Sequence, residues 1–340
     1  MIMVTVFMNS TLAHFNQLYC GLELMKKNNL IKLNYKIERE NYIGGGVTRI
    51  KVDDKTVMID IRDSNLIDID SYNKSNFYFK RMLLKKDYQA YEKLHPFGLN
   101  YSVMTESKDL KYLFLIDRKY FKYSLKYFKL LTRVLKVNDS LINCEHNNFE
   151  RKPNYKLPNL ILFSSRLWNP ANNETQWKKD ERRILNDQRI SIIRFLKKKY
   201  NTIFKGGILR NDYAEVECPD LIVETNFSNK KEYLKLLKKA TICVSNQGLE
   251  DSIGWKFAEY ICNSSAILTT PIDKYKTLGS LKEGINYLTF KTKEEFNSKL
   301  KILLDDKEIY NNMIKSNYKY YQEYLHPLSK MKKIFEIIKK

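Results

Sequence analysis

Hydrophobic positions after residue 158 alternate between two patterns. Short apolar runs of strand length are separated by longer segments with the three-to-four-residue spacing of amphipathic helices. The expected strands are 160–163, 202–204, 221–224, 240–244 and 265–269, and the expected helices are 180–200, 230–239 and 254–262. Such alternation is typical of a parallel sheet with helices on its faces. This half of the chain therefore predicts a doubly wound α/β domain.

The first half of the chain has shorter and less regular patterns. They predict a strand at 4–7, a helix at about 15–27, and further strands at 32–37, 47–52 and 57–61. The glycines of 44–46 lie between two expected strands. We interpret them as a turn, because a phosphate-binding loop leads from a strand into a helix.

The segment 149–158 marks a boundary between two domains. It is polar and charged and contains Pro153 and Pro158, which is typical of a linker. We therefore expect an N-terminal domain over residues 1–150 and a second domain from residue 151. The end of the chain, from about residue 307, has a helical pattern with one break at Pro327.

Composition narrows the class of protein. The first residues alternate like a strand and lack the basic flank of a signal peptide. No apolar run reaches the roughly 18 residues that a membrane-spanning helix needs. We therefore expect a cytoplasmic protein. The 5 cysteines and 4 histidines are scattered, without the spacing of a disulfide framework or a zinc cluster, and no bound metal or cofactor is expected.

The net charge of +21 has two interpretations. Codon drift in an AT-rich genome would produce the abundant Lys, Asn, Ile and Tyr without any functional cause. Alternatively, so basic a protein attracts nucleic acid, anionic lipid or phosphorylated substrates. Lys far outnumbers Arg, which weakens the nucleic-acid interpretation because bidentate contacts to bases and phosphates favour Arg.

The segment 240–260 carries the most informative chemistry. It predicts a strand, a polar loop and then a helix, and ligands of open α/β sheets bind beyond the carboxyl ends of the strands. The free N–H groups at the helix start suit a diphosphate. Lys256 would add positive charge, and Glu259 on the same helix face would accept hydrogen bonds from a ribose diol. An ordinary surface ion pair is the alternative for these two residues. The candidate nucleotide-binding residues here are Asn246, Gly248, Ser252, Gly254, Lys256 and Glu259.

The segment 240–271 resembles the donor-site motif of GT-B glycosyltransferases. It looks like the family 1/4-like retaining enzymes and is similar to exostosin-like bacterial polysaccharide transferases. This resemblance implies two Rossmann-like doubly wound domains that face a cleft, with the C-terminal helix, 317–340, crossing back toward the N-terminal domain and 151–316 as the donor-binding domain. It also implies that Glu259 holds the nucleotide ribose. The first glutamate of the retaining E-x7-E motif falls at Ser252, so the stereochemistry stays open.

A second match opens the same domain at residues 160–170. Its strand followed by a turn resembles the start of the GT-B donor domain, whose arginine grips the diphosphate and corresponds to Arg166 here. An Arg at the carboxyl end of a strand directs a fork of donors into the crevice. The alternative is a surface Arg in an interdomain contact. Gly207, in a segment interpreted as a strand end, is a weaker candidate for lining the same crevice.

A catalytic base would come from the N-terminal domain if the enzyme inverts the anomeric centre. His14, in the loop after the first strand, is the first candidate, with a capping or packed histidine as its alternative. Asp60 and Asp63 follow another strand. Asp68-Ile69-Asp70 has the DxD form of metal-dependent GT-A enzymes, and we attribute it to chance because no nucleotide-binding pattern surrounds it.

A basic helix face is expected over residues 118–136. Lysines and one arginine recur there at three-to-four-residue spacing beside aromatic residues. The face either lies on an anionic membrane surface, which would place the protein peripherally at the inner face of the plasma membrane, or is a solvated helix face.

The expected function is transfer of a sugar from a nucleoside-diphosphate sugar to a hydroxyl. The acceptor would be a bacterial surface glycan of capsule, O-antigen or teichoic type, or its lipid-linked precursor, and no nucleic acid is expected as a partner. Two alternatives stay open. One is a non-enzymatic polyanion- or nucleic-acid-binding protein, and the other is an inactive GT-B scaffold in a polysaccharide assembly complex.

Overall fold

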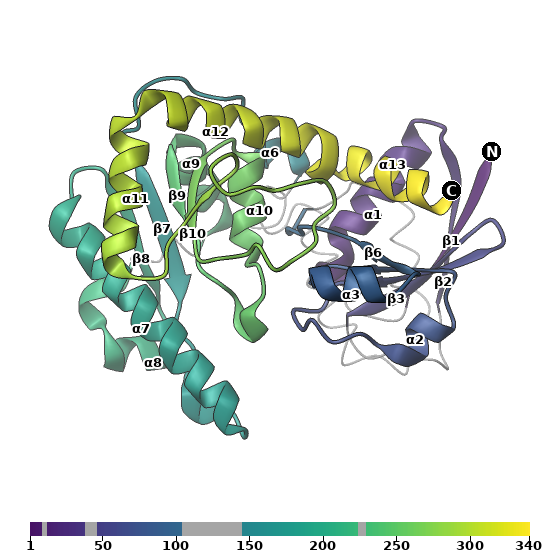
Figure 1. Ribbon diagram of the computed structural model, residues 1–340, viewed down its shortest axis with the longest axis horizontal. Helices are drawn as coiled ribbons and strands as arrows, with labels where there is room; N and C mark the ends of the chain where they lie inside the picture. The colour runs from purple at the N-terminus through teal and green to yellow at the C-terminus, as the bar shows by residue number, and fades with distance from the viewer. Residues whose placement is uncertain (9–11, 38–45, 104–144, 224–228) are drawn as a thin grey trace.

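The protein is described here by a computed structural model that covers residues 1–8, 12–37, 46–103, 145–223 and 229–340. Two α/β domains lie side by side, and the C-terminal helices run across both of them (Figure 1). The expected basic helix 118–136 lies outside the described residues. Among the described residues, no helix is both long enough and apolar enough to cross a membrane.

The N-terminal domain is built on a six-stranded sheet in the order β2-β1-β3-β4-β5-β6. Its strands are β1 (Ile2–Met8), β2 (Ile31–Ile37), β3 (Val47–Val52), β4 (Lys55–Asp60), β5 (Phe77–Lys80) and β6 (Leu94–Pro96). Its helices are α1 (Leu12–Lys27), α2 (Ile69–Asn73) and α3 (Lys85–Ala90). These elements confirm the strands and the helix expected in this half.

The N-terminal sheet is mixed. β3 pairs antiparallel with both β1 and β4, whereas the other pairs are parallel. Only Asp53 and Asp54 separate β3 from β4, with Asp53 at a φ of 52°. A two-residue connection can join only antiparallel strands, because a parallel pair needs a crossover of a dozen or more residues.

The C-terminal domain has a five-stranded sheet in the order β11-β10-β9-β7-β8, in which every pair is parallel. Its strands are β7 (Ile161–Arg166), β8 (Phe204–Leu209), β9 (Ile242–Val244), β10 (Ala266–Thr269) and β11 (Leu288–Thr289). Its helices are α6 (His146–Phe149), α7 (Gln176–Lys199), α8 (Asp212–Glu217), α9 (Lys230–Lys239), α10 (Trp255–Cys262) and α11 (Lys293–Asp305). The doubly wound domain predicted from the alternating pattern is confirmed.

Two expected strands of this domain were misplaced. The segment 202–204 reaches only the first residue of β8, so Gly206 and Gly207 lie inside the strand and not at its end. Their φ angles are +150° and +154°, and a Cβ on Gly206 would lie 1.8 Å from the Phe163 carbonyl oxygen. Glycine in a strand allows such a close approach but hides the strand signal. Of the segment 221–224, the described residues 221–223 overlap a 3-10 turn, Pro219–Leu221, and contribute an isolated bridge from Ile222 to Ile208.

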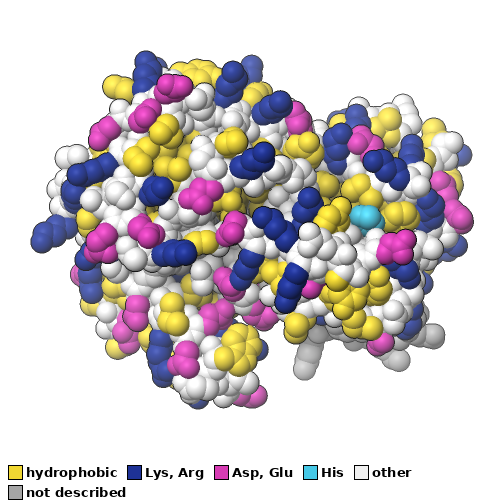
Figure 2. Space-filling view, in the orientation of Figure 1, with side chains coloured by type: hydrophobic (Ala, Val, Ile, Leu, Met, Phe, Trp, Pro, Cys, Tyr) yellow, Lys and Arg dark blue, Asp and Glu magenta, His cyan; other side chains and the backbone are white. Residues whose placement is uncertain are grey.

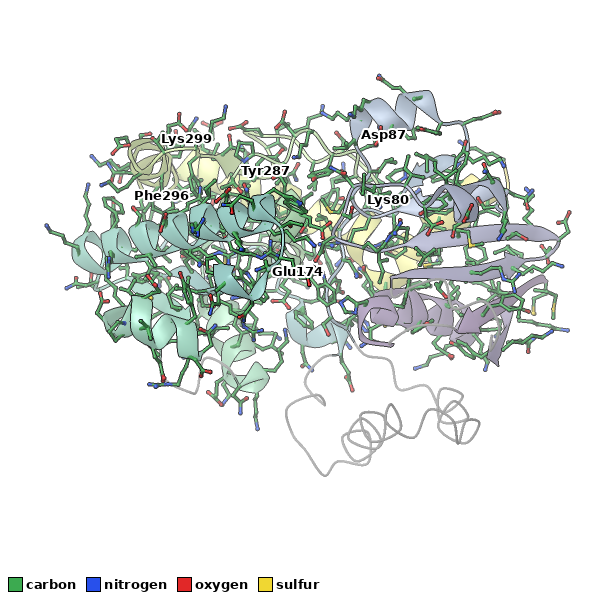
Figure 3. The ribbon with its side chains drawn as sticks, turned by 90° about the horizontal axis from the view of Figure 1, so that it is seen from below. Lys80, Asp87, Glu174, Tyr287, Phe296 and Lys299 are labelled. Atoms are coloured by element: carbon green, nitrogen blue, oxygen red, sulfur yellow. The ribbon has the colours of Figure 1, made fainter. Side chains whose placement is uncertain are left out.

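The end of the chain returns to the N-terminal domain, as expected of the GT-B type. α12 (Lys307–Tyr320) is followed by a π-helical turn, Tyr321–Leu325, and by α13 (Pro327–Ile338), which packs on α1. The buried Lys330 ammonium donates to Gln17 Oε1 at 2.9 Å and to the Leu99 carbonyl at 2.6 Å. Figure 3 shows the two domains from below, with Lys80 in the N-terminal domain and Phe296 and Lys299 in the other.

Candidate nucleotide-binding site

The site is defined by the point where the C-terminal sheet changes direction. β8 lies on one side of β7, and β9, the next strand along the chain, lies on the other side. Side chains at the carboxyl ends of β7 and β9 therefore flank a topological switch point, where open α/β sheets bind ligands. Arg166 ends β7, and the loop from Ser245 to Gly254 follows β9. The structure thus brings together the two segments on which the predicted donor site depends.

Arg189 on α7 fastens these two strand ends to each other. Its guanidinium donates to the Arg166 carbonyl at 2.6 Å, to the Gln247 carbonyl at 3.1 Å and to Asn246 Oδ1 at 3.2 Å. The side chain is buried, and burial lowers the pKa of Arg189 to about 10. Asn246 is thus held by the protein, and its Nδ2 also lies 3.4 Å from Gln188 Oε1.

Arg189 was not predicted from the sequence, although a signal was present. The buried apolar positions of α7 include Leu185, Ile192, Ile193 and Leu196. Arg189 falls on the same face at the helical spacing of four and three residues. Arg182 and Asn186 lie on this buried face as well, and an Arg among apolar positions predicts a buried ion pair or a set of carbonyl acceptors nearby.

The loop between β9 and α10 is closed on itself and strained. Gly248 N–H donates to the Ser252 carbonyl at 2.7 Å, and a Cβ on Gly248 would lie 2.6 Å from the buried Ser252 Oγ. Glu250 and Asp251 both have a φ of 57°, a left-handed conformation that costs about 1–2 kcal/mol per residue. Strain of this kind gathers at ligand-binding sites, where the surrounding contacts enforce it. Here Tyr275 donates to the Asp251 carbonyl, and Lys274 forms an ion pair with its carboxylate.

Lys256, in the first turn of α10, points to the sheet. Its ammonium donates to the carbonyl and to the hydroxyl oxygen of Ser164 on β7, with Oγ at 2.7 Å. Burial lowers the pKa of Lys256 to about 8, against the opposing effect of Glu259. Gly254, the N-cap of this eight-residue helix, has an ordinary φ of −63°, and a Cβ there would lie 3.5 Å from the Asn246 carbonyl oxygen.

Glu259 is buried and has two protein partners from α9. Lys230 Nζ lies 2.8 Å from Oε1, and the Tyr233 hydroxyl donates to Oε2 at 2.6 Å. Burial, and then the charge of Glu259, raise the pKa of Tyr233. Each carboxylate oxygen has a second lone pair, so the carboxylate retains capacity for further hydrogen bonds. The sequence did not predict the participation of α9.

Arg166 is exposed, in contrast to Arg189. Its guanidinium lies 5.9 Å from the centre of the Trp168 ring, and its backbone carbonyl is the acceptor for Arg189. Gly207 is further from the switch point, because it lies within β8, two residues before the strand ends. A Cβ there would meet the Leu221 carbonyl oxygen at 2.5 Å, so packing accounts for this glycine.

Both predicted catalytic residues lie where the N-terminal domain meets the start of α10. The exposed His14 is edge-on to Trp255, with ring centres 5.4 Å apart and planes at 82°. Arg81 forms an ion pair with Asp63 and also donates to the Ile253 carbonyl in the loop between β9 and α10. Figure 2 shows Lys and Arg side chains gathered where the two domains meet, above a notch between them.

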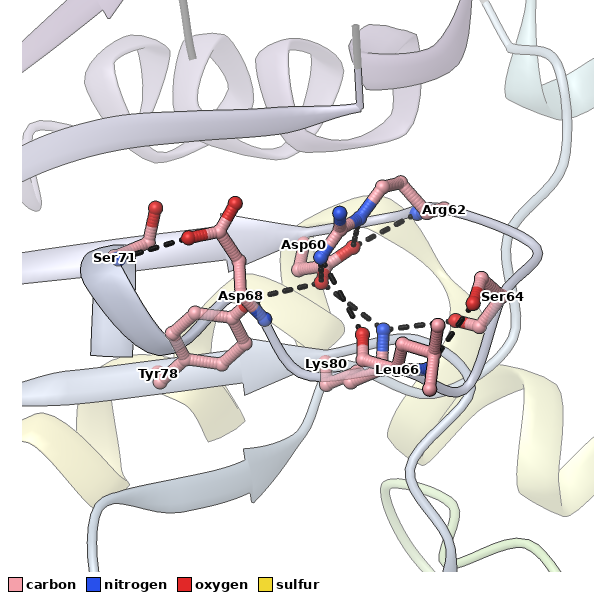
Figure 4. A network of polar contacts seen from close by, with 8 residues as sticks. All are labelled: Asp60, Arg62, Ser64, Leu66, Asp68, Ser71, Tyr78 and Lys80. Carbon is pink, nitrogen blue, oxygen red and sulfur yellow. Dashed lines mark hydrogen bonds and ion pairs between the residues drawn. The ribbon is translucent and has the colours of Figure 1, made fainter. Parts of the chain in front are cut away.

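A buried ionic cluster holds the segment that carries Asp63. Asp60 accepts from Tyr78 at 2.7 Å, from Arg62 at 2.7 Å and from Lys80 at 3.0 Å (Figure 4). Burial acts to raise the pKa of Asp60, but the hydrogen bonds and charges of these partners lower it overall. The Asp60 side chain is 0% exposed, which excludes it as a base open to the cleft and makes it a positioning residue for the following loop.

Comparison with known proteins gives likenesses of fold only. No protein-family profile matches the chain, and no curated protein matches it. A glycosyltransferase from Rickettsia africae is 12% identical, with 98% of this chain and 84% of that chain covered and a TM-score of 0.44. HepE from Anabaena, solved in complex with UDP, is 10% identical, with 57% and 55% covered and a TM-score of 0.32. The pneumococcal O-GlcNAc transferase GtfA, solved with UDP and GlcNAc, is 12% identical, with 94% and 55% covered and a TM-score of 0.38. This chain thus spans about half the length of HepE and GtfA, and two of the three proteins are named as transferases of sugars.

Proposed function

We propose that this chain is a glycosyltransferase that binds a nucleoside-diphosphate sugar at the switch point between β7 and β9. The observation that carries the proposal is the convergence of the exposed Arg166, the loop held by Arg189 and the start of α10 at one edge of the sheet. A cationic fork beside a helix N-terminus matches the charge and the geometry of a diphosphate. The sugar would pass to a hydroxyl of a bacterial surface glycan of capsule, O-antigen or teichoic type, or to its lipid-linked precursor.

The residues would divide the work as follows. Arg166 and the α10 N–H groups stabilise the negative charge that develops on the departing diphosphate, which is the main electrostatic demand of this reaction. Glu259 accepts hydrogen bonds from the ribose hydroxyls through its remaining lone pairs. His14 or Asp63 takes the proton of the attacking hydroxyl from the opposite side. The positive charge at the donor site comes from the protein, so the proposal needs no metal there.

Lys256 has a different part in this proposal from the one that its position in the sequence indicates. Reaching a diphosphate would require its ammonium to give up both acceptors on Ser164. We assign it the role of a positioning residue that fixes the first turn of α10 against β7. The N–H groups of the helix then stay directed at the switch point without reorganisation when the nucleotide binds.

Nucleotide binding by the whole chain tests the proposal. UDP, GDP, CDP and ADP are each titrated with EDTA present, and the thermal midpoint and the binding heat are measured for wild type, Glu259→Ala and the control Glu232→Ala. Glu232 is a partly exposed carboxylate on α9 that forms an ion pair with Lys235. At 100 times its Kd, a nucleotide stabilises the fold by about 2.7 kcal/mol. We expect one nucleotide to stabilise wild type and Glu232→Ala by this amount and to stabilise Glu259→Ala much less.

The other outcomes separate the competing functions. If no nucleotide binds at millimolar concentration and a salt-sensitive gel shift appears, the protein is a polyanion binder and the proposal fails. If a nucleotide binds but no nucleoside diphosphate is released from any nucleotide sugar, with or without glycan acceptors, the chain is an inactive scaffold.

A further inference from the structure

Three side chains from two distant parts of the chain form a cluster outside the donor site. The side-chain ligand atoms of His146, Glu150 and His326 lie within 4.8 Å of one another. His326 Nε2 is 3.8 Å from Glu150 Oε1, and the two imidazole rings are 5.0 Å apart with their planes at 86°. The cluster is partly accessible, since the side chains of His326 and Glu150 are 19% and 30% exposed.

The cluster lies where the chain passes between the domains. His146 is the first residue of the short helix α6, and Glu150 is its C-cap. The next residue, Arg151, is fixed to the C-terminal domain by bonds to the Asn263 carbonyl at 3.0 Å and the Lys238 carbonyl at 2.8 Å. His326 is the N-cap of α13, which packs on α1 of the N-terminal domain. α6 lies beside the junction of the C-terminal helices in Figure 1.

We propose that His146, Glu150 and His326 bind one zinc ion and thereby join the two connections between the domains. Two imidazole nitrogens and a carboxylate oxygen are ligands that Zn²⁺ prefers, and three protein ligands leave a fourth position for water. Tyr321, in the π-helical turn, donates to Glu150 Oε1 and so orients the carboxylate from behind. Outer hydrogen bonds of this kind are typical of metal sites and raise metal affinity.

The geometry requires only a small movement. A tetrahedral zinc ion with bonds of about 2.0–2.2 Å brings its ligand atoms to roughly 3.4 Å from one another. His326 Nε2 and Glu150 Oε1 are 3.8 Å apart, and all three ligand atoms lie within 4.8 Å of one another. Rotations about the side-chain bonds of the partly exposed His326 and Glu150 would bring them to the zinc distance. Sequence spacing gave no indication of this site, because His326 is far along the chain from the other two residues.

The ion would act on the relative mobility of the domains. α6 belongs to one domain and the start of α13 leads into the other, so a zinc bridge restricts rotation at this crossing. We therefore expect zinc to raise the thermal midpoint and to slow amide exchange in residues 321–327. Neither effect depends on nucleotide binding, so the result is independent of the proposed function.

The test measures zinc on the metal-free full chain. Zinc per chain is counted after dialysis, affinity is measured by competition with a chromophoric chelator, and Co²⁺ is used as a spectroscopic probe of geometry. The variants are His146→Asn, His326→Asn and Glu150→Gln. The matched controls are His95→Asn, a histidine whose ring contacts Phe77 and Phe79, and Glu323→Gln, a partly exposed carboxylate in the turn before His326.

We expect one zinc per chain, a tetrahedral Co²⁺ spectrum without thiolate bands, and a loss of affinity of more than about 100-fold in either His variant. Both controls should keep the wild-type affinity, and circular dichroism of the metal-free variants shows whether each remains folded. The proposal is overturned if folded wild type retains no zinc at micromolar concentration, if the His variants bind zinc as wild type does, or if the cobalt spectrum shows cysteine ligation.

Discussion

Lys230 on α9 reaches across to α10 and places its ammonium 2.8 Å from the Glu259 carboxylate. Together with the Tyr233 hydroxyl it occupies one lone pair on each carboxylate oxygen. The carboxylate that was predicted to bind ribose is therefore already oriented by the fold. The contribution of Glu259 to nucleotide binding can be separated from its contribution to stability by substituting Glu259 and its partner Lys230 in turn.

Replacing Glu259 by Gln should weaken nucleotide binding by at least about 10-fold, whereas Lys230→Ala should keep most of it. Glutamine preserves the shape but loses a charged acceptor, and removal of Lys230 leaves the carboxylate bonded to Tyr233. The free energy of unfolding should fall in both variants, by about 1–3 kcal/mol, because a buried polar group loses its partner. Calorimetric titration with the nucleotide that stabilises wild type measures the difference. Equal binding losses in the two variants would reduce Glu259 to a structural ion pair.

Arg166→Ala should lower affinity for nucleoside diphosphates by about 10-fold or more and affect monophosphates less. The reason is that the charge-assisted bonds of an exposed arginine would be made to the diphosphate. Since the side chain is exposed, unfolding free energy should change by less than about 0.5 kcal/mol. Arg183→Ala is the control, because Arg183 on α7 is also exposed. If UDP and UMP lose affinity equally, Arg166 does not contact the terminal phosphate.

The two glycines 254 and 206 should respond oppositely to alanine. Gly254 has an ordinary φ, and its Cβ would make only a normal contact. Gly254→Ala should therefore change the free energy of unfolding by less than about 1 kcal/mol, because the entropy gain of alanine opposes its poorer preference for the N-cap position. If a phosphate approaches this backbone closely, the same variant loses nucleotide affinity. Gly206→Ala places a Cβ 1.8 Å from a backbone oxygen and should prevent stable folding. Thermal midpoints and nucleotide titrations check both, and an unaffected affinity for Gly254→Ala places the phosphate elsewhere.

Stability above pH 8 should depend on Lys256. Burial lowers the pKa of this ammonium from 10.5 to about 8 in the folded chain. Between these values the unfolded chain holds the proton and the folded chain does not, so this residue makes unfolding free energy rise with pH. The slope approaches about 1.4 kcal/mol per pH unit. Urea unfolding from pH 7 to 9.5 should show this rise as a difference between wild type and Lys256→Met. The effects of the other titrating residues are common to both proteins and cancel in that difference. Parallel pH curves for the two proteins would contradict it.

Asp63 and His14 can be assigned by conservative exchange. Asp63→Asn keeps an acceptor for Arg81 but removes a base, and His14→Gln keeps a polar side chain against Trp255. Replacement of the residue that acts as base should lower kcat by at least about 100-fold with little change in nucleotide affinity. The other variant should retain kcat within a few-fold. Full activity of both variants would move the base to another residue.

Local pattern was sufficient for much of the fold. The helix Lys230–Lys239 was predicted with the correct ends. Its N-cap, Asn229, and its apolar face are both local features that depend only on neighbouring residues. The strands of the second domain followed from short apolar runs between amphipathic helices. The strand that became β8 was predicted to end at residue 204, where it begins, because Gly206 and Gly207 lack the side chains that carry the strand signal. Contacts with the neighbouring strand and turn explain why glycine stands at these two positions.

The sequence by itself determined two α/β domains, the returning C-terminal helix and the strand–loop–helix segment at 240–260, because hydrophobic periodicity and turn residues act over a few neighbours. Only the tertiary structure decided what each polar side chain meets. It joined Arg189 to two strand ends, turned Lys256 to Ser164, and brought His326 to His146 across most of the chain. Partners of this kind are fixed by packing between distant elements, where burial makes every unpaired donor or charge costly, and no local pattern records that constraint.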